Sequence, residues 1–428
     1  LKEFVSQTIF YGDHLKIIEG IDQSTVKPNK KLLDRLEYMI QNKKEYILLD
    51  EQKVVAENIK KEARIAFQEN QKAVIIVKGG PGTGKSVLAI QLLGDLLKIG
   101  LMGAYVSKNM APRKVYKNSL VNENEFSIHE LFKSSGYFFL DKENQYDFLL
   151  VDEAHRLQKK SGVHYNIGEN QIKEIIHASL LSVFFVDEKQ IVTLRDIGTI
   201  SNIKYFAKLD HAKVSEYELV SQFRCGGSDS YLDFIDQLLY NKRLSSKFYF
   251  DFQVLDSPQE LRELIQCKNT HNNARLVAGF CWTRNAKEAD NQQFMDIKIG
   301  DFEASWNLKH GEPFATRISA INEVGCIHNV QGLEFDYIGV ILGPDLKYLN
   351  GKVITDYKMR ANTEKSLYGL YVLMKKDKDY YEGIADTIIR NTYRVLLTRG
   401  IKGCYVYAVD PKLQDHLKKI ASNHFIHN

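Results

Sequence analysis

The stretch Gly79-Gly80-Pro81-Gly82-Thr83-Gly84-Lys85-Ser86 decides the fold of this chain. It follows the apolar run 73–77 and precedes the helical pattern 87–93, so the order is strand, glycine loop, helix. Glycines let backbone N–H groups close around phosphate oxygens in front of a helix N-terminus, and this P-loop order predicts nucleotide binding. Lys85 is expected to reach the β- and γ-phosphates, and the Ser86 hydroxyl to hold Mg²⁺. A Gly/Pro-rich octet also makes plain turns, which is the alternative. The residues expected to cradle the phosphates are Gly80, Pro81, Gly82, Thr83, Gly84, Lys85 and Ser86.

The bulk composition is typical of a globular protein with room for two cores. The chain has 428 residues, of which 44% are hydrophobic and 26% charged, more than one ordinary domain holds. The net charge of +4 is compatible with a phosphate-rich polymer partner but does not argue for one. No apolar segment approaches the ~20 residues that a membrane-spanning helix needs. The five cysteines are scattered without a C-x-x-C pair, which argues against a disulfide framework or a zinc site. We therefore expect a cytoplasmic protein with no membrane partner.

The pattern along the chain predicts an α/β fold with two cores. From about 50 to 220, helical segments alternate with short apolar strands, which indicates a parallel sheet covered on both faces. The pattern starts again near 220. The expected strands are 73–77, 103–106, 148–151, 183–186, 275–280, 337–342 and 404–408, with a helix over 231–239. The predicted units are a small helical accessory region at 1–48, a first core at 49–220, and a second core at 221–428 with insertions near 285–320 and 345–385.

Polar side chains follow the expected strands at their carboxyl ends, where ligands bind in such sheets. The strand 148–151 is followed by Asp152 and Glu153. Asp152 is expected beside the Mg²⁺ that Ser86 holds, and Glu153 is expected to polarise the attacking water. The alternative is an acidic helix start. The strand 183–186 is followed by Asp187 and, after two residues, Gln190, whose amide can sense a γ-phosphate; a turn-forming Asp is the alternative there.

Together these elements resemble the helicases of superfamily one, the UvrD-like group, and most closely the Schlafen-like bacterial ATPases of uncharacterised function. The likeness covers about 50–428 and is carried by the motifs GGPGTGKS, VDEAHR, SQFRCGG, HNVQGLEFDYIGVI and YRVLLTRG. The resemblance implies ATP and Mg²⁺ as ligands. It also implies two RecA-like P-loop NTPase cores in tandem, each a parallel sheet flanked by helices.

The resemblance implies three further nucleotide contacts, one upstream of the glycine loop and two near the boundary between the predicted cores. Gln52 would read adenine, although an ordinary helix-surface glutamine is the alternative. Phe223 would stack on the base and Arg224 would reach the γ-phosphate. The family commonly has tyrosine in place of Phe223, but stacking needs only the ring face.

On the second core, the resemblance implies that Gly332 lets the backbone approach the ligand and that Glu334 accepts from the ribose. Arg399 is the expected arginine finger, which stabilises charge on the transferring phosphoryl group. Arg394 would take that role under a shifted alignment, but the Leu-Thr-Arg run favours Arg399. Gln331 stands where the family usually has lysine, which removes one positive charge.

For the nucleic acid, the resemblance implies contacts from Ser107, Asn109, His129 and His328. Trp282 follows an expected strand and is either a stacking platform for an unpaired base or part of the core. Compared with UvrD-like helicases, the stretches between 109 and 147 and between 282 and 326 are short. Evidence for a wedge that splits duplexes is therefore missing.

The favoured interpretation is an ATP-hydrolysing motor of the helicase type, stimulated by nucleic acid and acting on single-stranded DNA or RNA. Its chemistry is expected to rest on Lys85, Ser86, Asp152, Glu153, Gln190, Arg224 and Arg399. The alternative is an ATP-dependent regulatory or scaffold module that controls an attached or partner effector, such as a nuclease. A third interpretation, a small-molecule kinase, conflicts with the second core. A partner in defence or repair is expected by analogy alone.

Overall fold

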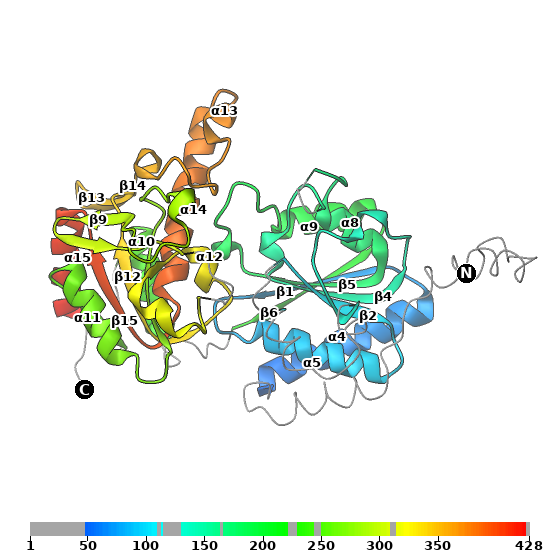
Figure 1. Cartoon of the computed structure of the whole chain (residues 1–428). Helices are drawn as coiled ribbons and strands as arrows, with labels where there is room; N and C mark the ends of the chain where they lie inside the picture. The colour runs from blue at the N-terminus through cyan, green and yellow to red at the C-terminus, as the bar shows by residue number, and fades with distance from the viewer. Residues whose placement is uncertain are drawn as a thin grey trace, which may run out of the picture.

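The computed structural model describes residues 48–108, 113, 130–162, 166–220, 229–243, 250–308 and 314–424. Across these residues the chain folds into two lobes, each built on a parallel sheet that helices flank (Figure 1). This confirms the predicted mixed α/β class. The predicted accessory region falls almost entirely outside the described residues.

The sheet of the first lobe has the strand order β3-β2-β4-β5-β1-β6, with every described pair parallel. Its strands are β1 (Ala73–Gly79), β2 (Gly103–Ser107), β3 (Phe132–Lys133), β4 (Tyr146–Asp152), β5 (Ser179–Val186) and β6 (Lys213–Leu219). Its helices are α4 (Asp50–Glu69), α5 (Lys85–Lys98), α8 (Gln171–Ala178) and α9 (Ile200–Leu209). Helices α4 and α5 cover one face of the sheet, and α8 and α9 cover the other (Figure 1).

Burial on both faces explains why β1 is a continuous apolar run. Ile75 and Val77 pack in the core under α4 and α5. Val74 and Ile76 point to the opposite face, where they pack in the core under α8 and α9. A strand covered in this way needs apolar residues at every position rather than at every second one.

The sheet of the second lobe has the order β11-β8-β12-β15-β7, and its described pairs are parallel as well. Its strands are β7 (Asp251–Val254), β8 (Ala274–Ala278), β11 (Val324–Gly325), β12 (Phe335–Leu342) and β15 (Gly400–Ala408). Its helices are α10 (Asp229–Leu239), α11 (Pro258–Lys268), α12 (Ile327–Val330), α14 (Lys378–Leu397) and α15 (Pro411–His424). One core joins α10, α14 and α15 to the sheet, and α11 packs in another.

Smaller elements lie in the two segments predicted as insertions. They are the antiparallel hairpins β9 (Ile297–Ile299) with β10 (Phe302–Ala304) and β13 (Leu346–Leu349) with β14 (Lys352–Thr355), and the short helix α13 (Leu370–Met374). Helix α13 projects from the second lobe beyond its neighbours (Figure 1). The 3-10 helices are η2 (Phe138–Leu140), η3 (Ala154–Arg156), η4 (Glu188–Gln190), η6 (Ala286–Glu288), η7 (Ile318–Asn322) and η8 (Tyr357–Met359). Within the described parts of the chain, no helix combines the length and the apolar character needed to span a membrane.

Candidate functional site

The glycine loop connects the end of β1 at Gly79 to the start of α5 at Lys85. Gly84 has a φ of +81°, which side-chain-bearing residues rarely adopt, and a Cβ there would lie 2.2 Å from Gln52 Nε2. The Lys85 ammonium donates to the carbonyl oxygens of Gly79 at 2.8 Å and Gly80 at 2.7 Å. The lysine is therefore folded back over the loop, with its charge at the N-terminus of α5.

A hydroxyl and a carboxylate meet at the ends of α5 and β4. Ser86 Oγ donates to Asp152 Oδ2 at 2.7 Å, and Tyr105 donates its hydroxyl to the same oxygen at 2.6 Å. Burial, followed by the charge of Glu153, raises the pKa of Asp152. Among the described residues, no group of three or more His, Cys, Asp or Glu side chains could hold a metal ion. Ser86 and Asp152 nevertheless offer two adjacent oxygens of the kind that Mg²⁺ takes from proteins, since it keeps waters and substrate phosphates as its other ligands.

Glu153 lies directly after β4 in the left-handed backbone region, with a φ of +53°. Its Oε2 is 2.9 Å from His155 Nε2. Burial by itself would raise the pKa of Glu153, but His155, then Lys85 and Arg399, outweigh it and hold that pKa well below its usual range. Glu153 is therefore a carboxylate at neutral pH.

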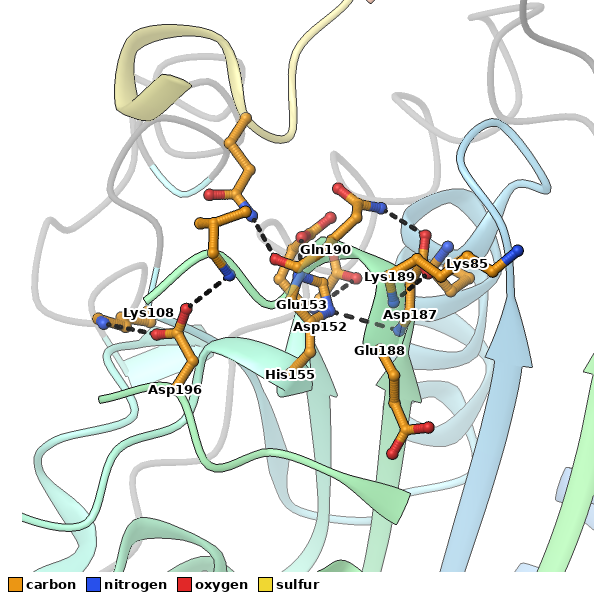
Figure 2. A network of polar contacts seen from close by, with 12 residues as sticks. Lys85, Lys108, Asp152, Glu153, His155, Asp187, Glu188, Lys189, Gln190 and Asp196 are labelled. Carbon is orange, nitrogen blue, oxygen red and sulfur yellow. Dashed lines mark hydrogen bonds and ion pairs between the residues drawn. The ribbon is translucent and has the colours of Figure 1, made fainter. Parts of the chain in front are cut away.

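Gln190 joins the two lobes. Its Nε2 donates to Asp187 Oδ2 at 2.8 Å, which fixes the amide at the end of β5. From the second lobe, Arg399 Nη2 reaches Gln190 Oε1 at 3.4 Å, and Gln331 Nε2 donates to the Gln190 carbonyl at 3.2 Å. Figure 2 shows Gln190 close to Glu153 and Asp152, so the ends of β4 and β5 meet the second lobe at one place.

Arg399 follows α14 and is only 1% exposed. Its Nε donates to the Val395 carbonyl at 2.9 Å, and its Nη1 to the Leu333 carbonyl at 3.3 Å. Arg394 behaves differently, because its Nε donates to Asp236 Oδ1 at 2.6 Å within the second lobe. Of these two arginines, only Arg399 lines the cavity between the lobes.

That cavity encloses about 570 Å³, including solvent at its mouth, and receives side chains from both lobes. Its described lining consists of Pro81, Gly82, Gly84, Lys85, Ser86, Val87, Glu153, Gln190, Gly332, Glu334 and Arg399. The structure therefore brings together, in one place, most of the residues that the sequence assigned to a nucleotide.

Other predicted nucleotide residues lie beside this cavity or outside the described residues. Gln52 is 3% exposed and is not among the described lining residues. Its Nε2 donates to the Thr83 carbonyl at 3.0 Å, and its Oε1 accepts from the Leu49 N–H at 3.0 Å. Gln52 therefore connects the glycine loop to the start of α4. Gly80 and Thr83 belong to the loop, where Thr83 Oγ1 donates to the Gly80 carbonyl at 3.0 Å. Phe223 and Arg224 lie outside the described residues.

The residues predicted to contact nucleic acid differ in how exposed they are. The Ser107 side chain is fully buried at the end of β2, so it presents no hydroxyl to a partner. Trp282 is partly buried against a core of the second lobe, with its ring centroid 6.3 Å from that of Trp306. His328 is exposed on α12. Asn109 and His129 lie outside the described residues.

Lys108 follows Ser107, directly after the end of β2. Its Nζ is 3.6 Å from Asp196 Oδ1, as Figure 2 shows at the edge of the polar network. Burial lowers the pKa of Lys108 to about 8, with Asp196 opposing the shift and the cations Arg156 and Arg195 adding to it. Several positive side chains therefore gather beside the cavity, around one buried carboxylate.

Sequence reasoning missed the side chains that support the site. Tyr105 donates to Asp152, His155 lies 2.9 Å from Glu153, and Asp187 accepts from the Gln190 amide. His155 and Asp187 could have been noticed, because both stand within two or three residues of an assigned carboxylate or amide. Tyr105 carries no such signal, since it lies in an ordinary apolar strand.

Comparisons with known proteins point to a family. A family model described as Schlafen group 3, DNA/RNA helicase domain, matches residues 72–410. The chain is 25% identical over 390 residues to the uncharacterized protein YPL245W of Saccharomyces cerevisiae, covering 81% of this chain and 84% of that protein. It is also 25% identical over 123 residues to a UPF0273 protein of Thermotoga maritima, covering 27% of this chain and 50% of that one.

Among solved structures, the chain is similar to a DNA replication initiation factor, with a TM-score of 0.24 and 16% identity, over 48% of this chain and 56% of that one. It is also similar to AMPPCP-bound DnaA from Aquifex aeolicus, with a TM-score of 0.22 and 17% identity, over 46% of this chain and 55% of that one. The matches span little more than half of either structure, and a likeness this low carries no argument about function.

Proposed function

The chain belongs to the Schlafen group 3 family of DNA/RNA helicase domains, and from this premise we propose that it is an ATPase stimulated by nucleic acid. In this proposal it is a motor of the superfamily-one type, with two RecA-like cores, that moves along or remodels single-stranded DNA or RNA. The observation that carries the proposal is the cavity lined from both lobes, with the Lys85 loop on one side and Arg399 on the other.

ATP is the proposed substrate of this cavity. The backbone of the loop and the N-terminus of α5 would hold its phosphates. Lys85 would exchange its two carbonyl partners in the loop for phosphate oxygens, and Gln52 would keep the loop in shape. Phe223 and Arg224 are proposed as the base-stacking and γ-phosphate contacts of the family motif, and Glu334 as the ribose contact.

Mg²⁺ fits the pair formed by Ser86 Oγ and Asp152 Oδ2, whose atoms are 2.7 Å apart. When bound, the ion would neutralise charge on the phosphates. The protein's own part is to keep Asp152 in place. Tyr105 does so through its hydroxyl, and the Glu153 N–H through its bond of 2.9 Å to Asp152 Oδ1.

In the proposed hydrolysis, the oxygen of a water molecule bonds to the γ-phosphorus while the bond from that phosphorus to the β–γ bridging oxygen breaks. Glu153, which is a carboxylate at neutral pH, accepts the proton of the water as the new bond to phosphorus forms. Gln190 orients the water, and Arg399 stabilises the negative charge that spreads over the transferring group. ADP then leaves with the bridging oxygen.

The same contacts would make hydrolysis depend on how the lobes pack. Gln190 is held by Arg399 and Gln331 of the second lobe. A γ-phosphate that engages Arg399 competes for the guanidinium with Gln190 Oε1. The lobes would therefore close on ATP and loosen after hydrolysis, and a single strand gripped across them would be moved stepwise.

Nucleic acid is proposed to run along the edge where the positive side chains gather. Lys108 would contact a backbone phosphate, and His328 and Trp282 would contact the strand from the second lobe. Ser107 is fully buried at the end of β2, so in this proposal it positions Lys108 and does not itself contact the strand. Phosphate contacts of this kind give affinity without sequence preference.

The test is an ATPase titration of the protein with single-stranded DNA, single-stranded RNA and duplex, for the parent and for Lys85→Ala. We expect turnover that rises with a single strand and is lost in the variant. A rate that ignores every nucleic acid would instead support the second candidate, an ATP-dependent regulatory module. The small net charge of +4 is the observation that favours that alternative.

A further inference from the structure

The segment between β14 and α14 carries exposed aromatic side chains for which the proposed hydrolysis has no use. Tyr368 is 67% exposed, Tyr371 65% and Val372 63%. They lie on and next to α13, which projects from the second lobe (Figure 1). With Tyr357, whose ring lies against that of Tyr371 at a centroid distance of 6.2 Å, they form a surface called here the aromatic ridge.

The aromatic ridge is fixed by the residues beneath and beside it. Leu370 of α13 is buried, and the Tyr357 hydroxyl donates to Glu382 Oε1 of α14 at 3.1 Å. The Ser366 carbonyl accepts a hydrogen bond of 2.7 Å from the Leu194 N–H of the first lobe. The exposed rings therefore stand on a scaffold that packing and hydrogen bonds hold in place.

The charge around the aromatic ridge is positive. Between residues 357 and 380, all of which the structure describes, the exposed charged side chains are five lysines and two aspartates, namely Lys358, Lys365, Lys375, Lys376, Lys378, Asp377 and Asp379. Lysine is depleted in the core of protein–protein interfaces, whereas lysines interleaved with aromatic rings suit an unpaired polynucleotide. The rings can stack on bases while the ammonium groups neutralise phosphates.

The aromatic ridge also contacts the first lobe. The guanidinium of Arg195 lies 5.2 Å from the Tyr368 ring centroid. Arg195 is exposed and is the neighbour of Asp196, which pairs with Lys108. Arg195 therefore connects the positive side chains around Lys108 to the aromatic ridge, so one strand could contact both.

We propose that the aromatic ridge is a second contact surface for unpaired nucleic acid, on which bases stack on Tyr368 and Tyr371. This inference rests on the proposed function, because it extends the path of the same strand. The aromatic ridge would extend the path of the strand beyond the space between the two lobes. The strand would leave that space past Arg195 and pass over α13.

The test measures binding of labelled oligo-dT and oligo-U to the full chain by fluorescence anisotropy, for the parent and for Tyr368→Ala with Tyr371→Ala. We expect the double variant to bind at least about 30-fold more weakly, as expected for the loss of two stacked bases. Tyr205→Ala is the matched control, because Tyr205 is 58% exposed on α9, away from the aromatic ridge. Phenylalanine at positions 368 and 371 keeps the ring faces and should restore the affinity.

Basal ATP hydrolysis without nucleic acid should be equal in all these variants, because none of these tyrosines lines the cavity. Equal affinity of the parent and the double alanine variant would overturn the inference while leaving the proposed function standing. A parent protein that binds neither oligonucleotide would overturn the proposed function, and the inference with it.

Discussion

Replacing Arg399 by alanine should separate ATP hydrolysis from ATP binding. The guanidinium holds the Val395 and Leu333 carbonyls and the Gln190 amide. Hydrogen bonds of this kind contribute about 0.5–1.5 kcal/mol each, so the folded state should lose about 1.5–4.5 kcal/mol. A finger arginine contributes about 10³–10⁵ to the rate in GTPase systems, and we expect hydrolysis to fall by at least about 10³-fold.

The assay is single-turnover ATP hydrolysis at saturating single-stranded nucleic acid, with nucleotide affinity and thermal unfolding measured on the same samples. Arg394→Ala is the matched control, because Arg394 is also a buried arginine of the same segment but pairs with Asp236 outside the cavity. It should lose stability to a similar or larger extent, since breaking a buried ion pair is costly, and yet keep hydrolysis near the parent rate. Hydrolysis by a folded Arg399→Ala protein at the parent rate would refute the finger assignment.

Three further predictions concern the carboxylate, the lysine and the loop. Glu153→Gln should still bind ATP but hydrolyse it about 10²–10⁴-fold more slowly in single-turnover assays, and equal rates would exclude Glu153 as the base. Affinity for a single strand, measured by anisotropy, should fall from pH 7 to pH 9, because Lys108 has a pKa of about 8 and binds phosphate only when it is protonated. The variant Lys108→Arg should keep its affinity over this pH range. If the variant shows the same pH dependence as the parent, Lys108 does not make the contact. Gly84→Ala should lower the urea midpoint, with a loss of about 1 kcal/mol or more, because its φ is positive and Gln52 blocks the new Cβ. Gly80→Ala is its control, since nothing lies within 4 Å of a Cβ there, and equal midpoints would contradict the strain argument.

The interior strands could be predicted from the sequence because burial on both faces makes them continuous apolar runs. The predicted run 73–77 falls within β1, and 148–151 falls within β4. Strand β6 was missed, because it lies at the sheet edge beside β1 and alternates exposed polar residues with partly buried ones over Lys213–Leu219. Strand β7 is an edge strand too, and its four residues carry too little pattern to identify.

The sequence predicted those site residues that lie in the glycine loop or directly after a strand. Lys85, Glu153, Gln190 and Arg399 come from distant parts of the chain, and the structure places them around one cavity. The parallel topology explains this for the first three, since the carboxyl ends of neighbouring strands share one edge. Arg399 required the resemblance, because no local pattern says which buried arginine of the second lobe faces the first.

What the sequence could not supply is how side chains pair once they are buried. Such pairs join residues that lie far apart in the sequence. Examples are the hydrogen bond of Tyr105 to Asp152, the ion pair of Lys108 with Asp196, and the hydrogen bond of Gln52 to the Thr83 carbonyl. The burial of Ser107, which was predicted as a nucleic-acid contact, likewise follows from its place on a covered strand. The superfamily-one type of motor stays a proposal, whereas membership of the helicase-domain family is shown.

The most direct measurement of the central claim is a crystal structure of the protein with Mg²⁺ and a non-hydrolysable ATP analogue. The account predicts a γ-phosphate that contacts Lys85 of the first lobe and Arg399 of the second at the same time. A triphosphate held by the first lobe alone, with the Arg399 guanidinium still bonded to Val395, Leu333 and Gln190 and not to the phosphate, would contradict it.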